Sequence, residues 1–427
     1  MNQNMRPLKI SGYSLSFIAM ISLFACKEKT TQQGEIPVID IAEALNNPTE
    51  IKLSQLGSKI TYIPLELTDS ALIGERPAAL TVTSEYIFVS NNNIFSNDEC
   101  MAFDRKTGKF ISSVGHTGQG PQAFSENVPV IDDINDKVTF PGMQENLVVY
   151  TPEGKFTESI SLPLYPGNIN SYVFADNNII IYDGASFGSS TSNILKLSSS
   201  GELLDSVLIK KFDKSNENNG DVVNSIAVGN TLGTLPGLVL ITKYNDETVN
   251  FKFRKFRWLW KFDQNVRFYD YYRDTIFNYA DNKLNAEYAV NLGDYPRKDY
   301  GDAKHMARMP IIRTFLENSE KMLFIGNAGI QTGSFFAGIY NKATRQTHAS
   351  IITTSSFKTD GFENDIDGFM PVLLTAISDT GEFVGMLTIE QIQTWIENHP
   401  DYEFSPEMSR IKDLDDDSNP VVVILSK

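Results

Sequence analysis

The segment from Glu363 to Gly368 carries the sequence feature closest to a metal site. Glu363, Asp365 and Asp367 alternate with other residues and are followed by Gly368, which is how a calcium-binding loop begins. The twelfth position of such a loop supplies a bidentate glutamate, but here it is Leu374. The segment therefore favours a solvated acidic turn, with calcium binding as the alternative, and no residue is assigned as a metal ligand.

The segment 251–262 combines basic and aromatic side chains. It holds five positive charges in a chain of formal net charge −16, and two of the three tryptophans. Arg257, Trp258 and Trp260 are the residues that would stack on a sugar ring or contact an anionic glycan. The same alternation, with one slip at positions 254 and 255 typical of a β-bulge, also describes a single strand with aromatics packed inside and basic residues in water. We take the strand as the simpler interpretation and ligand contact as the alternative.

The motifs of common enzymes do not stand out in the sequence. The four histidines (116, 305, 348 and 399) lie far apart, and none has the spacing of metal ligands. The glycines at 115, 118 and 120 lack the lysine and hydroxyl residue that end a phosphate-binding loop, and fit a tight connection between sheets. The sequence therefore identifies no catalytic residue, and no bound cofactor is expected, with calcium as the alternative.

Residues 1–25 have the features of a secretory signal. Arg6 and Lys9 give a positive start, and the apolar stretch 13–24 follows. This stretch is too short to cross a membrane, which takes about 20 apolar residues. Its length suits the apolar centre of a signal peptide, so we expect residues 1–25 to be removed.

Leu23-Phe24-Ala25-Cys26 follows at the point where cleavage is expected, and it resembles the bacterial lipobox. The resemblance implies that diacylglycerol is attached to the thiol of Cys26 and that the chain is cut before it. Residues 26–36 are then a lipidated tether. We expect the protein to be held by lipid at the outer membrane of the cell envelope, on its periplasmic or its outer face.

The composition excludes some partners. Loss of Arg6 and Lys9 with the signal leaves 35 basic against 53 acidic residues, a formal charge of −18. Such a chain is a poor partner for nucleic acid or bare anionic lipid. Its hydrophobic content of 41% is ample for a globular core. Once Cys26 is lipidated only Cys100 remains, so no intrachain disulfide forms.

Short apolar and aromatic runs separated by turn residues fill the chain up to about residue 385, which predicts an all-β fold. One element recurs as a strand, a turn that ends in glycine, and a second strand. Its glycines are Gly108, Gly154, Gly201 and Gly381, which are 46 and 47 residues apart and then 180, or four steps of 45. A period near 45 residues is typical of the four-stranded blades of a β-propeller.

The number of blades depends on the turns between Gly201 and Gly381. Three pairs of turn residues lie there, at 245–246, 281–282 and 341–342. Counting all three gives seven blades. Treating 245–246 as internal to an enlarged blade gives six.

Residues 115–124, with Pro129, Asn146, Tyr150 and 154–156, resemble the NHL-type propeller repeat. The chain from about residue 35 onward is similar to the six-bladed propeller lipoproteins of Gram-negative bacteria, most of which are uncharacterised. Three further segments carry this similarity: Tyr62–Glu66, Arg273–Phe277 and Asn419–Ile424. The resemblance implies one six-bladed β-propeller domain over residues 37–427, with seven blades as the alternative.

Two expectations concern the last blade. A propeller must close its ring, so we expect the strand 421–425 to pair with an N-terminal strand near 59–67. Ile389, Ile392, Trp395 and Ile396 follow helical spacing, and a second helix start lies at 405–406, which predicts a small helical insertion at about 389–412 with Trp395 packed.

These features together predict a binding or scaffolding lipoprotein of the cell envelope, with its ligand on one face of the ring or at the mouth of the central channel. A glycan or an envelope protein is the expected partner. The alternative, by analogy of fold, is a metal-dependent hydrolase of the propeller lactonase type. Acidic and asparagine side chains converging on the channel would favour the hydrolase.

Overall fold

The computed structural model describes residues 36–74, 79–91, 99–163, 169–184, 191–211, 223–229, 235, 238–244, 249–254, 256–270, 273–294, 310–329, 334–352 and 361–427. For β15, β16 and β17 we describe the backbone alone. No helix among these residues is long and apolar enough to cross a membrane.

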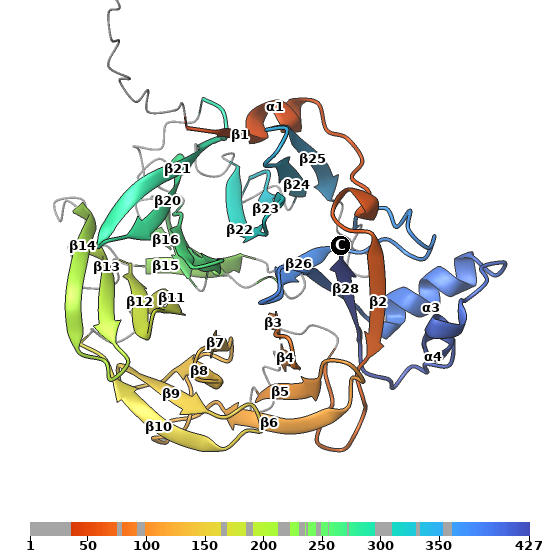
Figure 1. The fold of residues 1–427 in the computed structure, drawn as a ribbon, viewed down its shortest axis with the longest axis horizontal. Coiled ribbons are helices and arrows are strands. Elements are labelled where there is room, and N and C mark those ends of the chain that lie inside the picture. Colours follow the sequence, from red (N-terminus) through yellow and green to blue (C-terminus); the bar gives the residue numbers. More distant parts are fainter. Residues whose placement is uncertain are drawn as a thin grey trace, which may run out of the picture. The chain divides into compact units, whose positions relative to one another are not determined.

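Within the described residues, six blades of antiparallel strands are arranged around a central axis (Figure 1). The chain is therefore a six-bladed β-propeller, as the sequence predicts. The first blade contains β3 (Ala79–Val82), β4 (Tyr86–Ser90), β5 (Glu99–Asp104) and β6 (Phe110–His116). The second contains β7 (Val130–Asp132), β8 (Lys137–Pro141), β9 (Asn146–Tyr150) and β10 (Phe156–Ser161). The third contains β11 (Ile169–Ala175), β12 (Asn178–Asp183), β13 (Thr191–Ser198) and β14 (Leu203–Lys211).

The last three blades follow the same order, from an inner strand outward. The fourth blade contains β18 (Leu259–Phe262), β19 (Asn265–Phe268), β20 (Thr275–Ala280) and β21 (Lys283–Asn291). The fifth contains β22 (Ile311–Glu317), β23 (Lys321–Asn327), β24 (Phe335–Asn341) and β25 (Thr347–Ile352). The sixth contains β26 (Leu374–Ile377), β27 (Phe383–Leu387), β28 (Val421–Ser426) and β2 (Lys59–Pro64). A short strand, β1 (Val38–Asp40), adds to the fourth blade parallel to β21. α1 (Ile41–Asn46) and the 3-10 turn η1 (Leu53–Gln55) connect β1 to β2.

The ring is closed by the two ends of the propeller. β2 pairs antiparallel with β28, from Lys59 opposite Ser426 to Pro64 opposite Val421. The predicted closure is thereby confirmed. Asn419, just before β28, is buried, and its side chain bonds to three backbone groups of the connection between β2 and β3, at residues 66, 71 and 73. The Asn419 motif thus fixes the seam of the ring.

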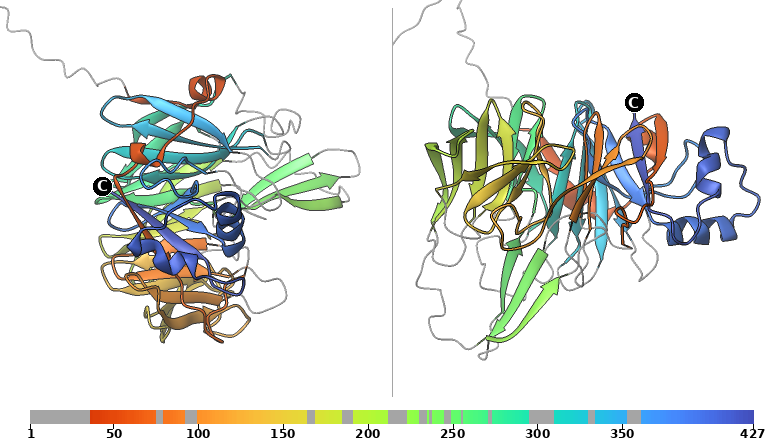
Figure 2. Two further views of the ribbon diagram at one scale, coloured as in Figure 1. Left: turned by 90° about the vertical axis from the view of Figure 1, so that its right-hand side faces the viewer. Right: turned by 90° about the horizontal axis from the view of Figure 1, so that it is seen from below.

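A separate three-stranded sheet is inserted between the third and fourth blades. It consists of β15 (Val223–Gly229), β16 (Leu238–Tyr244) and β17 (Val249–Arg254), and Figure 2 shows it extending from one face of the ring. This inserted sheet accounts for the additional turn residues at 245–246, which gave the alternative count of seven blades. Positions 245–246 themselves lie outside the described residues. The prediction of one continuous strand over 251–262 was wrong, because β17 ends at Arg254 in this sheet and β18 begins at Leu259 inside the ring.

Three of the recurring glycines have a common structural reason. Gly108, Gly154 and Gly201 lie in the turn between the third and fourth strands of blades one to three, with φ of +72°, +83° and +89°. A Cβ on any of them would lie 2.1–2.2 Å from a backbone carbonyl oxygen of the preceding blade. Gly381 lies instead between the first and second strands of its blade, so the prediction that it is a fourth copy was wrong.

The helical insertion lies between β27 and β28, as predicted, and projects from the outer side of the last blade (Figure 2). It contains α3 (Ile389–Asn398), the 3-10 turn η3 (Pro406–Met408) and α4 (Ser409–Lys412). Thr388 caps α3 by accepting a hydrogen bond from the backbone N–H of Gln391. Trp395 packs against Phe369, with ring centroids 4.7 Å apart, so it belongs to the core beneath the insertion.

Candidate binding cavity in the central channel

A cavity of about 890 Å³ follows the axis of the ring. Its wall is made by the inner strands β3, β7, β11, β18, β22 and β26 and by the turns at their ends. These strands come together because each blade contributes its first strand to the centre and the strands of neighbouring blades contact each other. A cavity of this size falls in the usual range for small-molecule sites.

The wall of this cavity, which we call the channel wall, combines apolar side chains with charged ones. Five acids and three cations line it: Glu126, Asp133, Asp263, Glu317 and Asp379, and Arg257, Lys261 and Lys427. Val128, Ile131, Val173 and Leu259 are among its apolar members. Lys261 of β18 donates to both carboxylate oxygens of Asp133, at 2.7 and 2.8 Å. The charge of Lys261 is thus matched within the protein.

Glu317, the last residue of β22, is the acid at the centre of a buried network in the channel wall. Its side chain is fully buried, and its carboxylate lies 3.3 Å from Nε of Arg267 and 2.8 Å from Nζ of Lys342. It also accepts a hydrogen bond of 3.0 Å from the indole Nε1 of Trp260. Burial lowers the pKa of Lys342, although Glu317 opposes the shift. Glu317 is therefore neutralised by two cations and fixes the ring of Trp260.

Arg257 is placed differently from the other charged groups of the channel wall. It precedes β18 in the fourth blade, and its Nη2 donates over 3.4 Å to the carbonyl oxygen of Leu80 in β3, in the first blade. Burial lowers the pKa of its guanidinium to about 10. Among the described residues, no carboxylate forms an ion pair with it. Thr81, next to Leu80, also lines the cavity, and its buried hydroxyl has no hydrogen-bond partner there.

The three residues named from sequence for ligand contact are divided by the structure. Arg257 and Trp260 lie in the channel wall. Trp258 is 3% exposed and stacks on Phe256, with centroids 4.8 Å apart, so it belongs to the core. Cys26, the predicted site of lipid attachment, lies outside the described residues. Sequence reasoning missed Thr81 and Glu317, because nothing in their local sequence marks residues that meet only when the ring closes.

The acidic segment 363–368 directs its carboxylates to separate protein donors. Asp365 accepts from the backbone N–H and the hydroxyl of Ser54, at 3.0 and 2.6 Å. Asp367 accepts from the hydroxyl of Tyr62, at 3.0 Å, and Glu363 forms an ion pair with Lys52. In the part of the chain that the structure describes, no three histidine, cysteine or acidic side chains are gathered to hold a metal ion.

Comparison with known proteins identifies the family and the fold. Residues 36–426 match the family described as a domain of unknown function, DUF4934. No curated protein matches the chain. Among solved structures, a protein of Bacteroides fragilis described as a “putative exported protein” is 14% identical, with 89% of this chain and 98% of that chain covered and a TM-score of 0.61.

Two other solved structures match at a TM-score of 0.40. One is a member of the DUF4221 family from Bacteroides vulgatus, at 8% identity with 87% of this chain and 97% of that chain covered. The other is the WD40 repeat domain of RRP9, at 9% identity with 89% and 99% covered. The match over residues 36–426 shows that the chain belongs to the DUF4934 family, and the Bacteroides fragilis structure shares its fold.

Proposed function

We propose that this member of the DUF4934 family is a lipoprotein of the cell envelope that binds a ligand in the central channel of its propeller and does not act as an enzyme. The observation that carries the proposal is the cavity of about 890 Å³ lined by residues of all six inner strands. Its wall combines apolar side chains with charged and polar groups that can orient a ligand.

The location rests on the signal-like N-terminus and on the Leu23–Cys26 motif. The similar Bacteroides fragilis protein is also described as exported, which agrees with this location. Replacement of Cys26 by serine is expected to move the protein from the membrane fraction to the soluble fraction and to abolish labelling with a palmitate analogue. The matched control is Cys100→Ser, because Cys100 is fully buried and burial raises its pKa to about 12. Membrane retention of the Cys26 variant would contradict the anchor.

Ligand binding is tested by native mass spectrometry of protein purified from its own envelope. We expect a bound small molecule that is lost in Val128→Trp, because the indole would fill part of the cavity. The control is Leu208→Trp on the outer strand β14, where Leu208 is half-exposed. Retention of the molecule in both variants would place its site elsewhere.

A calcium scan separates binding from metal-dependent hydrolysis. A ligand at 100 times its dissociation constant stabilises a protein by about 2.7 kcal/mol, which is readily seen as a shift in melting temperature. We expect the same melting temperature in excess calcium and in chelator. A clear rise with calcium would contradict the proposal and favour the hydrolase.

A further inference from the structure

Arg257 reaches across the channel. In a ring of six blades the first and fourth face each other, and the guanidinium of Arg257, from the fourth blade, reaches the backbone of β3 in the first. Its hydrogen bond to Leu80 is long, at 3.4 Å, and engages one nitrogen of a group that has five N–H donors. Most of its donors are therefore available to a molecule inside the cavity.

The other cations that line the cavity are paired with carboxylates. Lys261 pairs with Asp133, and Lys427 pairs with Glu320. Arg257 has no such partner among the described residues, and burial disfavours its charge. A partly buried cation without an anion is unfavourable, and a bound anion would offset that cost.

We propose that the ligand of the channel is a small organic anion whose carboxylate, sulfonate or phosphate group binds Arg257 while its apolar body lies against the channel wall. This inference rests on the proposed function and names the class of ligand. The planar guanidinium forms paired hydrogen bonds with such groups, and these bonds are stronger in a site shielded from water. Thr81, next to Leu80, lines the same part of the wall.

Four probes with one apolar body separate the head groups. Benzoate, benzenesulfonate and phenyl phosphate carry the three anionic groups, and benzamide is the neutral counterpart. Calorimetric titration of the purified full-length protein is expected to detect binding of at least one anion and none of benzamide. Arg257→Gln is expected to weaken that binding by about ten-fold or more, the size expected when a charge-assisted hydrogen bond is lost.

The matched control is Lys137→Gln, which removes one positive charge from a partly exposed ion pair with Glu158 in the second blade, outside the cavity lining. It is expected to leave the affinity unchanged. If Arg257→Gln does not fold, Arg257→Lys takes its place. It is expected to weaken binding of the same anion, because lysine lacks the paired donors.

Three outcomes overturn the inference. The first is that the anions bind no better than benzamide. The second is that the Arg257 variants bind the anions as tightly as the original protein does. The third is that Lys137→Gln weakens anion binding as much as the Arg257 variants do. If the anions fail while a co-purified molecule is still lost in Val128→Trp, the channel binds a neutral ligand. In that case the proposed function stands and only the anionic class is wrong.

Discussion

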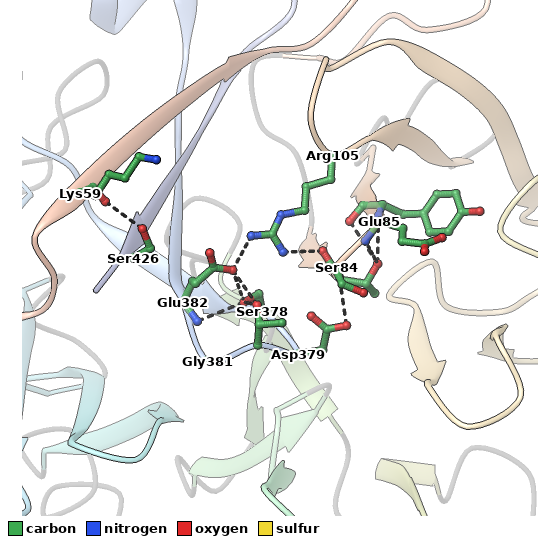
Figure 3. A network of polar contacts seen from close by, with 12 residues as sticks. Lys59, Ser84, Glu85, Arg105, Ser378, Asp379, Gly381, Glu382 and Ser426 are labelled. Atoms are coloured by element: carbon green, nitrogen blue, oxygen red, sulfur yellow. Dashed lines mark hydrogen bonds and ion pairs between the residues drawn. The ribbon is translucent and has the colours of Figure 1, made fainter.

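Arg105 and Glu382 join the first and the last blade of the propeller through an ion pair of their side chains (Figure 3). Arg105 follows β5, and Glu382 lies in the turn between β26 and β27. Arg105 also donates to the carbonyl oxygen of Thr83, at 2.8 Å. The carboxylate accepts from the hydroxyls of Ser378 and Thr380 as well, at 2.9 and 2.7 Å. This pair therefore supports the seam that β2 and β28 close.

The first prediction concerns the strength of this pair. Arg105→Gln is expected to lower the free energy of unfolding by about 1–3 kcal/mol, because the charge-assisted hydrogen bonds to Glu382 and Thr83 are lost. The side chains are only 14% and 22% exposed, so water replaces these bonds poorly. A double-mutant cycle with Glu382→Gln in urea unfolding isolates the pair. A coupling energy near zero would show that the two side chains do not stabilise the seam together.

The second prediction concerns acid. Burial alone would raise the pKa of Glu382, but hydrogen bonds from Thr380, Arg105 and Ser378 outweigh it and lower the pKa. An unfolded glutamate has a pKa of about 4.3, so Glu382 contributes stability above that pH and loses it as pH falls through the lower folded pKa. We expect the difference in unfolding free energy between the original protein and Glu382→Gln to shrink as pH falls from about 5 to 3. A difference that stays constant over this range would contradict the lowered pKa.

The fold could be predicted because most of its determinants are local. Short strands repeat in every blade, turn glycines recur at the same place in the first three blades, and the strand 421–425 is a continuous apolar run. Helical spacing followed by Pro400 marked the insertion in the same direct way. Such signals need no knowledge of distant contacts.

Two local predictions failed because one sequence pattern serves two structures. Gly381 has the positive φ of a turn glycine, as Gly201 does, yet its turn joins different strands of the blade. The alternation over 251–262 continues through the boundary between β17 and β18, since both strands need the same pattern. Sequence periodicity does not record which sheet a strand joins.

For the cavity, the sequence predicted only the location of a ligand site, on one face of the ring or at the mouth of the central channel. Thr81, Arg257 and Glu317 come from three different blades and meet at the channel wall because the ring closes. Arg257 was named from sequence for its basic and aromatic neighbours, and its position across the channel came from the fold. Nothing in the local sequence distinguishes Thr81 from other residues of the wall, because threonine is common in β-strands.

The third prediction compares two glycines with the same backbone conformation. Gly108 and Gly368 both have φ of +72°, but a Cβ on Gly108 would lie 2.1 Å from the carbonyl oxygen of Pro64, whereas Gly368 has open space. Gly368→Ala is expected to cost about 1 kcal/mol for the left-handed conformation alone. Gly108→Ala is expected to cost clearly more, because β2 must move away from the turn. Equal urea midpoints for the two variants would show that this contact between blades is not tight.

The fourth prediction concerns Glu317, whose removal leaves Arg267, Lys342 and the indole N–H of Trp260 without their shared acceptor. Glu317→Leu is expected to lower the free energy of unfolding by about 3–5 kcal/mol, since Lys342 loses its carboxylate partner and Arg267 keeps only Glu287. The control is Glu320→Gln, because Glu320 pairs with Lys427 at the surface and its loss is expected to change little. Thermal unfolding followed by tryptophan fluorescence measures both variants. Equal melting temperatures for Glu317→Leu and Glu320→Gln would show that the network around Glu317 does not stabilise the packing of the fourth blade against the fifth.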